Sequence, residues 1–292
     1  MKTVALLLDD PENQYQQLAA REAQAAAGRQ GVQLLGPDFA SGSAWAQVEA
    51  INAHLRREKP LDGMLIMLAA GDTTPSLFER VVKAGIPLVF LNRVPTWVEE
   101  LRKARPEALL AGVTPRQESI GEIQARHALR LVPKGSFVLL VTGDEAARTA
   151  VDRKRGFLNA VAGRLEVHSL NGFWTAQGAE RAVSDWLRLG GWRERPPVAI
   201  VCHNDVMSLG VRKALARYAA SAEASEITVP PLVGCDGLVE EGQAMVKRGD
   251  LVGTVVVPPT TPTAFEILGR YWASGIRTGT VLLDSESFPP LA

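Results

Sequence analysis

The segment AIVCHNDVMSLGVRKAL, residues 199–215, places three polar residues between an apolar run and a helical pattern. His203, Asn204 and Asp205 follow four apolar residues directly, and apolar residues then recur at helical spacing. Asp often caps a helix, because its side chain accepts the unpaired N–H groups of the first turn. We therefore expect Asp205 to anchor the helix and Asn204 to be aimed at a ligand.

Hydrogen-bonding or aromatic side chains follow most of the other apolar runs that we interpret as strands. They are Asp9, Asn13 and Tyr15 after the first strand, Asn92 and Arg93 after the fourth, Arg153 beyond the sixth, Trp174 after the seventh and Asp236 after the ninth. The third strand is followed by AAGDTT, residues 69–74. Ligands of open α/β sheets bind at the carboxyl ends of the strands, so these residues are candidates for one binding site.

The chemistry of this set is suited to a neutral polyol. Arg, Asp and Asn offer planar groups that pair with adjacent hydroxyls, and an aromatic ring covers the C–H face of a sugar. Each residue also has a structural alternative. Arg93 could lie on the surface, Arg153 could pair with Asp152 or Glu145, Trp174 could belong to the core, and Asp9 and Asp236 could cap turns. Taken together, the set favours a ligand site.

Catalysis and cofactor binding find less support in the sequence. It contains no GxGxxG motif, no phosphate-binding loop and no GxSxG elbow, and its four histidines match no nucleophile pattern. Cys202 and Cys235 each end an expected strand and are interpreted as buried thiols, with a disulfide as the weaker alternative. No Cys/His spacing indicates zinc. We expect no enzyme activity, no cofactor and no metal.

Apolar runs alternate with amphipathic stretches along the 292 residues, which predicts βαβ units and parallel sheets. Eleven expected strands exceed one comfortable open sheet and favour two lobes. Residues 94–106, with two prolines and many charges, break the alternation and are interpreted as a crossing or a surface insertion.

The charge balance bears on partners and location. Lys plus Arg equals Asp plus Glu at 32 each, so nucleic-acid binding by this chain alone is not expected. No apolar run reaches the roughly 20 residues that span a bilayer. The first apolar run, residues 4–8, is followed by two aspartates and is interpreted as a strand. We expect a periplasmic protein if a signal peptide has been trimmed, and a cytoplasmic one otherwise.

In order and spacing, several segments resemble the ribose-binding-protein and LacI/GalR-type group, the type I periplasmic binding proteins. The segments are TVALLLDDPENQYQ, AGIPLVFLNR, DRKRGFLNAV, AIVCHNDVMSLGVRKAL, LVGCDGLVEEGQAMVKRGDLVGTVV and TAFEILGRYWASG. The resemblance implies an α/β fold of two Rossmann-like lobes with parallel sheets, joined by a three-segment hinge that closes on a ligand. It places residues 1–112 and 258–279 in the N-terminal lobe, and residues 113–257 and 280–292 in the C-terminal lobe.

The resemblance also assigns ligand contacts. The matching positions are Asn13, Tyr15, Asn92, Arg93, Arg153, Trp174, Asn204 and Asp236. Asp9 stands where carriers often have a small polar residue and Gln16 where a second aromatic is common, and we include both in the predicted site. Because these positions and Cys235 depart from the family pattern, a modified, deoxy or acidic sugar, or another polar small molecule, remains open. The pair Phe173–Trp174 leaves open which ring stacks on the ligand.

We therefore predict a solute-binding receptor for a sugar-like molecule, with an ABC transporter permease or a sensor kinase as its partner. The alternative is the effector-binding core of a LacI-type regulator, which would need a helix-turn-helix headpiece. The printed sequence begins instead on the expected first strand.

Overall fold

The computed structural model describes residues 1–69, 75–220 and 229–291. The chain divides into two compact units, unit 1 (residues 1–115 and 258–283) and unit 2 (residues 116–257 and 284–292). The chain therefore passes from one unit to the other three times. Within the described residues, no helix is long and apolar enough to cross a membrane.

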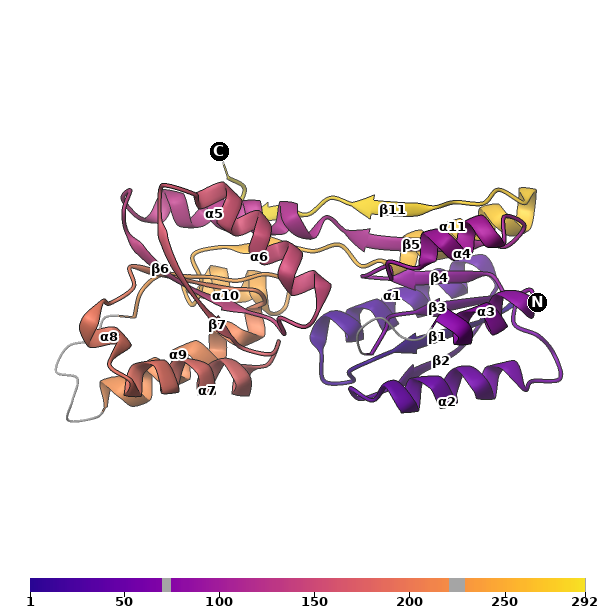
Figure 1. Ribbon diagram of the computed structural model, residues 1–292, viewed down its shortest axis with the longest axis horizontal. Coiled ribbons are helices and arrows are strands. Elements are labelled where there is room, and N and C mark those ends of the chain that lie inside the picture. Colours follow the sequence, from indigo (N-terminus) through magenta and orange to yellow (C-terminus); the bar gives the residue numbers. More distant parts are fainter. Residues whose placement is uncertain (70–74, 221–228, 292) are drawn as a thin grey trace. The chain divides into compact units, whose positions relative to one another are not determined.

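Unit 1 contains a parallel sheet with the strand order β11-β5-β4-β3-β1-β2 (Figure 1). Its strands are β1 (Thr3–Leu8), β2 (Gln33–Phe39), β3 (Gly63–Ile66), β4 (Leu88–Leu91), β5 (Leu110–Pro115) and β11 (Thr280–Leu283). Its helices are α1 (Gln14–Gln30), α2 (Ala44–Leu55), α3 (Pro75–Lys83), α4 (Val98–Ala104) and α11 (Thr261–Ser274). β11 pairs with β5 of unit 1, whereas the resemblance placed residues 280–283 in the C-terminal lobe.

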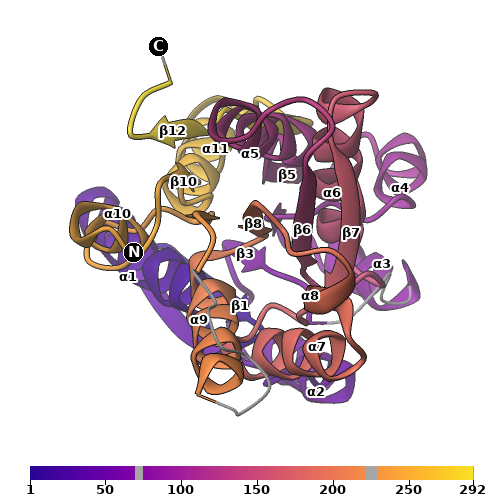
Figure 2. The same cartoon turned by 90° about the vertical axis from the view of Figure 1, so that its left-hand side faces the viewer.

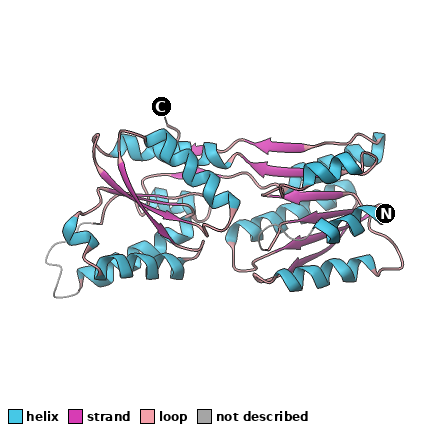
Figure 3. Cartoon of the chain, in the orientation of Figure 1, coloured by secondary structure: helices cyan, strands magenta, loops and turns pink. Residues whose placement is uncertain are grey.

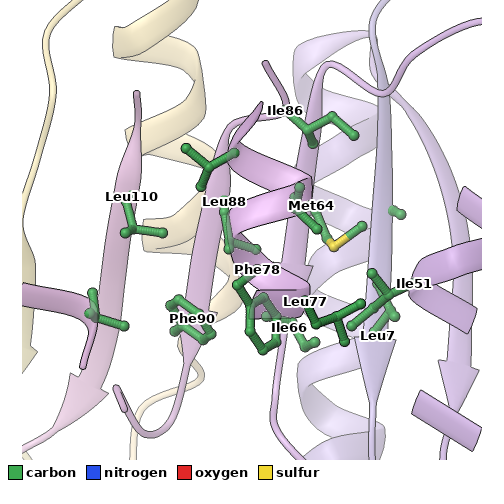
Figure 4. Packing of buried hydrophobic residues seen from close by; sticks show 14 of the residues in the cluster. Leu7, Ile51, Met64, Ile66, Leu77, Phe78, Ile86, Leu88, Phe90 and Leu110 are labelled. Atoms are coloured by element: carbon green, nitrogen blue, oxygen red, sulfur yellow. The ribbon is translucent and has the colours of Figure 1, made fainter. Parts of the chain in front are cut away.

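One face of this sheet is covered by α2, α3 and α4, whose apolar side chains meet those of the central strands (Figure 4). Phe78 of α3 packs edge-on against Phe90 of β4, with ring centroids 5.2 Å apart, and stacks on Trp97. The interpretation of residues 94–106 as a crossing or surface insertion was wrong. The segment forms α4, and the buried Val98 and Leu101 explain why a charged stretch with two prolines joins the core.

Unit 2 contains a second parallel sheet with the strand order β7-β6-β8-β9, and a short antiparallel pair of β10 and β12. The strands are β6 (Phe137–Thr142), β7 (Glu166–Asn171), β8 (Ala199–Cys202), β9 (Leu232–Val233), β10 (Thr254–Val256) and β12 (Glu286–Phe288). The helices are α5 (Gln117–Leu131), α6 (Arg148–Val161), α7 (Ala176–Arg188), α8 (Gly191–Glu194), α9 (Asp205–Ala219) and α10 (Gly242–Arg248). Figure 3 shows this alternation of strands and helices.

Helices cover both faces of the sheet of unit 2. α7 and α9 lie side by side on one face, which Figure 2 shows, and α5 and α6 pack on the other. The strands are accordingly buried on both faces, which explains their continuous apolar runs. The expected βαβ architecture is thus confirmed in each unit.

Two glycines allow α5 and α6 to cross at close range. A Cβ at Gly121 would overlap the backbone carbonyl of Arg153, and a Cβ at Gly156 would overlap that of Glu118. The crossing brings Arg153 of α6 next to the start of α5, where it reaches the side chain of Gln117.

Gly156→Ala should lower the free energy of unfolding by about 1–3 kcal/mol, because the added methyl group forces the two backbones apart. Urea denaturation measures this change. Gly28→Ala is the matched control, since Gly28 lies in α1 with open space around its Cβ position. That substitution should leave the stability unchanged or raise it by about 1 kcal/mol, because Ala is the better helix former. Equal effects of the two substitutions would show that the crossing tolerates separation.

Candidate functional site

In unit 1, Asp9 follows β1 at the carboxyl edge of the sheet. Its carboxylate accepts a hydrogen bond from the backbone N–H of Gly42 at 2.8 Å. Burial raises the pKa of the Asp9 carboxyl, while the Gly42 N–H and the charge of Arg93 act in the opposite direction. Asp9 therefore holds the loop after β2 in place. Its partly exposed carboxylate is also a hydrogen-bond acceptor at the ends of the strands.

Asn92 and Arg93 follow β4 at the same edge. Asn92 has a left-handed backbone (φ 64°), fixed by hydrogen bonds from its N–H to Val113 and from the hydroxyl of Thr114 to its carbonyl. Its side chain makes no hydrogen bond to any described residue. Nη2 of Arg93 donates to the carbonyl of Leu68 at 2.7 Å, so the guanidinium lies across the end of the neighbouring third strand. Residues 70–74 of the polar segment that follows this strand lie outside the described residues.

The other three predicted residues of unit 1 have contacts within the fold. Asn13 caps α1 by accepting the N–H of Gln16 at 3.1 Å. Oε1 of Gln16 accepts the N–H groups of Asp9 and Asp10, at 2.8 and 3.1 Å. The hydroxyl of the buried Tyr15 donates to the carbonyl of Pro258 at 2.9 Å. These contacts shape the loop after β1, and direct ligand contacts by the three residues stay a prediction.

In unit 2, Arg153 is 5% exposed and sits among the ends of the strands. Its Nε and Nη2 both donate to Oε1 of Gln117, at 3.2 and 2.8 Å. Nη1 donates to the carbonyl of His203 and to Sγ of Cys235. The alternative that Arg153 pairs with Asp152 or Glu145 was wrong. Those carboxylates accept from other cations, which are Arg148, Lys154 and Arg155.

Trp174 lies beside this arginine. The guanidinium carbon of Arg153 is 5.4 Å from the centroid of the indole, and the ring of His203 is 6.0 Å away. A Cβ at Gly143 would overlap the indole, so the ring rests on the backbone after β6. Phe173 is 56% exposed and makes no such contacts among the described residues. Trp174 is therefore the better placed of the two rings to border a site at Arg153.

The cap of α9 is Asn204 and not Asp205, while a ligand contact by Asn204 stays a prediction. Asn204 caps α9, because its Oδ1 accepts the N–H of Met207 at 2.9 Å, and its Nδ2 donates to the carbonyl of Trp174. Asp205 is the first residue of the helix, and its carboxylate accepts from the hydroxyl of Thr254 at 2.7 Å and from the N–H of Gly237 at 2.8 Å. The prediction that Asp205 caps the helix was wrong. Asp205 anchors it instead to β10 and to the loop after β9.

Asp236 follows β9 and also has a left-handed backbone (φ 97°). Burial raises the pKa of its carboxyl to about 7, although the charge of Arg153 opposes this shift. Cys235 beside it and Cys202 at the end of β8 are buried, free thiols, and burial raises the pKa of each. The weaker alternative of a disulfide was therefore wrong.

Two polar residues next to Arg153 were not included in the predicted site. Gln117 begins α5 and is 8% exposed, and His203 is fully buried. The position of His203 directly after a strand could have indicated it. No feature of the sequence around Gln117 does so, because Gln117 reaches Arg153 only through the crossing of α5 and α6. Among the described residues, no group of three or more His, Cys, Asp or Glu side chains could hold a metal ion.

Comparison with known proteins places this arrangement in a family. A family model described as periplasmic binding protein domain matches residues 4–264. No curated protein matches the sequence. Solved structures with the same fold include a galactofuranose binding protein, which is 19% identical, with 98% of this chain and 94% of that chain covered and a TM-score of 0.82.

Two further solved structures are similar over almost their whole length. One is an ABC transporter periplasmic solute binding protein from Actinobacillus succinogenes 130z with bound D-allose. It is 18% identical and has a TM-score of 0.83, with 98% of this chain and 97% of that chain covered. The other is the Caulobacter myo-inositol binding protein bound to myo-inositol. It is 18% identical and has a TM-score of 0.80, with 98% of this chain and 92% of that chain covered. The chain therefore belongs to the periplasmic binding protein domain family.

Proposed function

We propose that the chain is a solute-binding receptor for a sugar or a sugar-like molecule, that it serves an ABC transporter in the periplasm, and that it catalyses no reaction. The solved structures with this fold support the proposal, because those named above are a galactofuranose binding protein, a solute binding protein with bound D-allose and a myo-inositol binding protein. They also make the LacI-type regulator the less favoured alternative.

The observation that carries the proposal is the backbone conformation of the predicted ligand residues. Among the described residues, five that are not glycine have a positive φ: Ser41, Asn92, Phe173, Trp174 and Asp236. Three of these five are predicted ligand contacts, and each directly follows a strand or lies within three residues of its end. Such conformations cost about 1–3 kcal/mol and concentrate at ligand sites, where the surrounding structure maintains them.

The chemistry of the two strand edges is consistent with a polyol. Unit 1 offers the carboxylate of Asp9, the amide of Asn92 and the guanidinium of Arg93, while unit 2 offers Arg153 and Trp174. Carboxylates and amides accept from hydroxyls, guanidinium groups donate to them, and the indole supplies a flat apolar face. Closure of the two lobes on the ligand stays a prediction from the family resemblance.

Melting temperatures should rise in the presence of one class among monosaccharides, sugar acids, sugar alcohols and nucleosides. A ligand at 100 times its Kd adds about 2.7 kcal/mol to the stability of the folded chain, which differential scanning fluorimetry detects readily. A panel in which nothing shifts the transition would contradict the proposal.

Asn92→Gly tests the site without disturbing the fold, because glycine adopts the left-handed conformation freely. We expect it to lower ligand affinity at least about tenfold, the equivalent of one lost hydrogen bond of about 1.4 kcal/mol. The free energy of unfolding should stay within about 1 kcal/mol of the parent. Ser41→Gly is the matched control, since Ser41 has the same backbone conformation (φ 50°) and is not a predicted ligand contact. Calorimetric titration that finds equal affinities for the two variants would remove Asn92 from the site.

A further inference from the structure

Two buried nitrogen atoms beside Arg153 have no hydrogen-bond partner among the described residues. They are Nε2 of Gln117 and Nε2 of His203, on side chains that are 8% and 0% exposed. An unsatisfied buried polar group costs about 1–3 kcal/mol, so such groups are rare in folded proteins. Two of them around one buried arginine indicate a place where a ligand completes the hydrogen bonding.

Both nitrogen atoms are hydrogen-bond donors. Nδ1 of His203 accepts the backbone N–H of Gly143 at 3.2 Å, which leaves the proton of the neutral ring on Nε2. The ring is neutral because burial, together with the charges of Arg153 and Lys154, lowers the pKa of His203 well below its usual value. In Gln117, Oε1 accepts from Arg153, so the free end of the amide is its NH₂ group.

Arg153 adds a positive charge and a third donor to this cluster. Its contacts with Gln117, His203 and Cys235 use four of its five N–H groups, which leaves one on Nη2. The acceptors of the cluster are already engaged, because Oε1 of Gln117 receives two bonds and Nδ1 of His203 receives one. The three side chains therefore offer donors and no free acceptor.

A ligand group that only accepts matches such a cluster better than a hydroxyl. A hydroxyl would bring a proton that none of the three side chains can accept, whereas a carboxylate has two oxygen atoms and no proton to place. Hydrogen bonds from a guanidinium to a carboxylate are also about twice as strong as those between neutral groups.

The two carboxyl groups nearby, those of Asp205 and Asp236, do not prevent an anion from binding. Both oxygen atoms of Asp205 are engaged, by Thr254 and by Gly237. Burial raises the pKa of Asp236 to about 7, so this group carries only part of its charge at neutral pH.

We propose that Gln117, Arg153 and His203 form a donor-only subsite in unit 2 that binds the carboxylate of a sugar acid. This inference rests on the proposed function and narrows its ligand class. The indole of Trp174 lies against Arg153 and His203. The carboxylate therefore takes the place of the indole beside these two side chains when it binds.

Isothermal titration calorimetry at pH 7 with matched pairs of sugars tests the subsite. The pairs are D-galacturonate with D-galactose and D-glucuronate with D-glucose, which differ only in the oxidation state of C6. We expect at least one acid to bind tenfold or more tightly than its neutral partner. Neutral sugars that bind as well as or better than their acids would overturn the subsite and leave the proposed function standing. Binding of none of these four compounds, together with no shift across the wider panel described above, would overturn both.

Gln117→Glu provides the decisive variant, because it preserves the shape and the acceptor for Arg153 but replaces the NH₂ donor with a second carboxylate oxygen. The preference for the acid should fall at least tenfold in this variant. Gln177→Glu adds the same charge at an exposed position of α7 and should leave the preference unchanged. A preference that survives Gln117→Glu would overturn the assignment. If Gln117→Glu fails to fold, His203→Phe takes its place as the test. It removes the other donor, keeps an aromatic ring, and should lower the preference for the acid at least tenfold.

Discussion

Arg153→Ala should lower the free energy of unfolding by about 3 kcal/mol and remove the ligand-induced rise in melting temperature. Each buried acceptor that loses its donor costs about 1–3 kcal/mol, because the acceptor is left buried and unpaired. Here the substitution deprives Oε1 of Gln117 and the carbonyl of His203 of their donor. It also removes the positive charge that opposes the raised pKa of Asp236.

Arg148→Ala on the same helix is the matched control for this prediction. Arg148 pairs with Asp152 at 2.9 Å, and its side chain is 66% exposed, so the pair is worth at most about 1 kcal/mol. Urea denaturation should therefore show a loss of unfolding free energy that is larger for Arg153→Ala than for Arg148→Ala by about 2 kcal/mol or more. A difference within experimental error would show that the Arg153 network does not stabilise unit 2.

Stability and binding can be separated with Arg153→Lys. Lysine keeps the charge and most of the buried stem, but it lacks the planar fork that contacts Gln117 and His203 together. The variant should fold, and it should lose at least about tenfold in affinity, because an ammonium group cannot hold Gln117 and His203 in position and also donate to the ligand. Retention of full affinity would mean that Arg153 acts on the ligand only through its charge.

The architecture of each unit was largely predictable, because strands buried on both faces have continuous apolar runs. β1, β4 and β6 illustrate this, since each is almost entirely buried. The short β12 escaped prediction, because its three residues, ESF, contain no apolar run and pair only with β10. α4 escaped because prolines and charges surround the few apolar residues that bury it.

The candidate site was predictable by position but less so by role. Residues after strands can be found from the pattern, and Asp9, Arg93, Trp174 and Asp236 all lie at the strand ends where the sequence placed them. The choice of Asp205 over Asn204 as the cap could not be settled, because both residue types cap helices equally well. The buried environment of Arg153 depends on Gln117, 36 residues earlier in the chain, and on two glycines that let α5 and α6 approach.

Asp236→Asn should reduce the loss of unfolding free energy that accompanies a rise in pH from 4 to 7. The carboxyl of Asp236 has its pKa raised from an ordinary value of 3.8 to about 7, so between these values the folded chain holds a proton that the unfolded chain has released. The contribution of this group to stability is therefore fully present below 3.8, its pKa in the unfolded chain. It is lost as the pH rises to about 7, its pKa in the folded chain. The slope is about 1.4 kcal/mol per pH unit within that interval.

The measurement is the difference in unfolding free energy between Asp236→Asn and the parent, by urea denaturation at pH 4.5, 5.5 and 6.5. A difference is required because buried histidines act in the opposite direction. Burial lowers the pKa of His127 to about 4, so stability from that group increases as the pH rises, and the two slopes offset each other in the parent. Asn cannot titrate, so the stability of the variant relative to the parent should increase by about 1.4 kcal/mol per pH unit.

Asp185→Asn is the control for this titration, because Asp185 lies on the surface of α7, its side chain is 55% exposed, and it pairs with Arg188. Its difference from the parent should stay nearly flat with pH, since a surface ion pair contributes at most about 1 kcal/mol. A flat difference for Asp236→Asn as well would mean that Asp236 is ionised in the folded chain. Its charge would then be balanced by Arg153, and a carboxylate ligand would have to compete with Asp236 for the same guanidinium group.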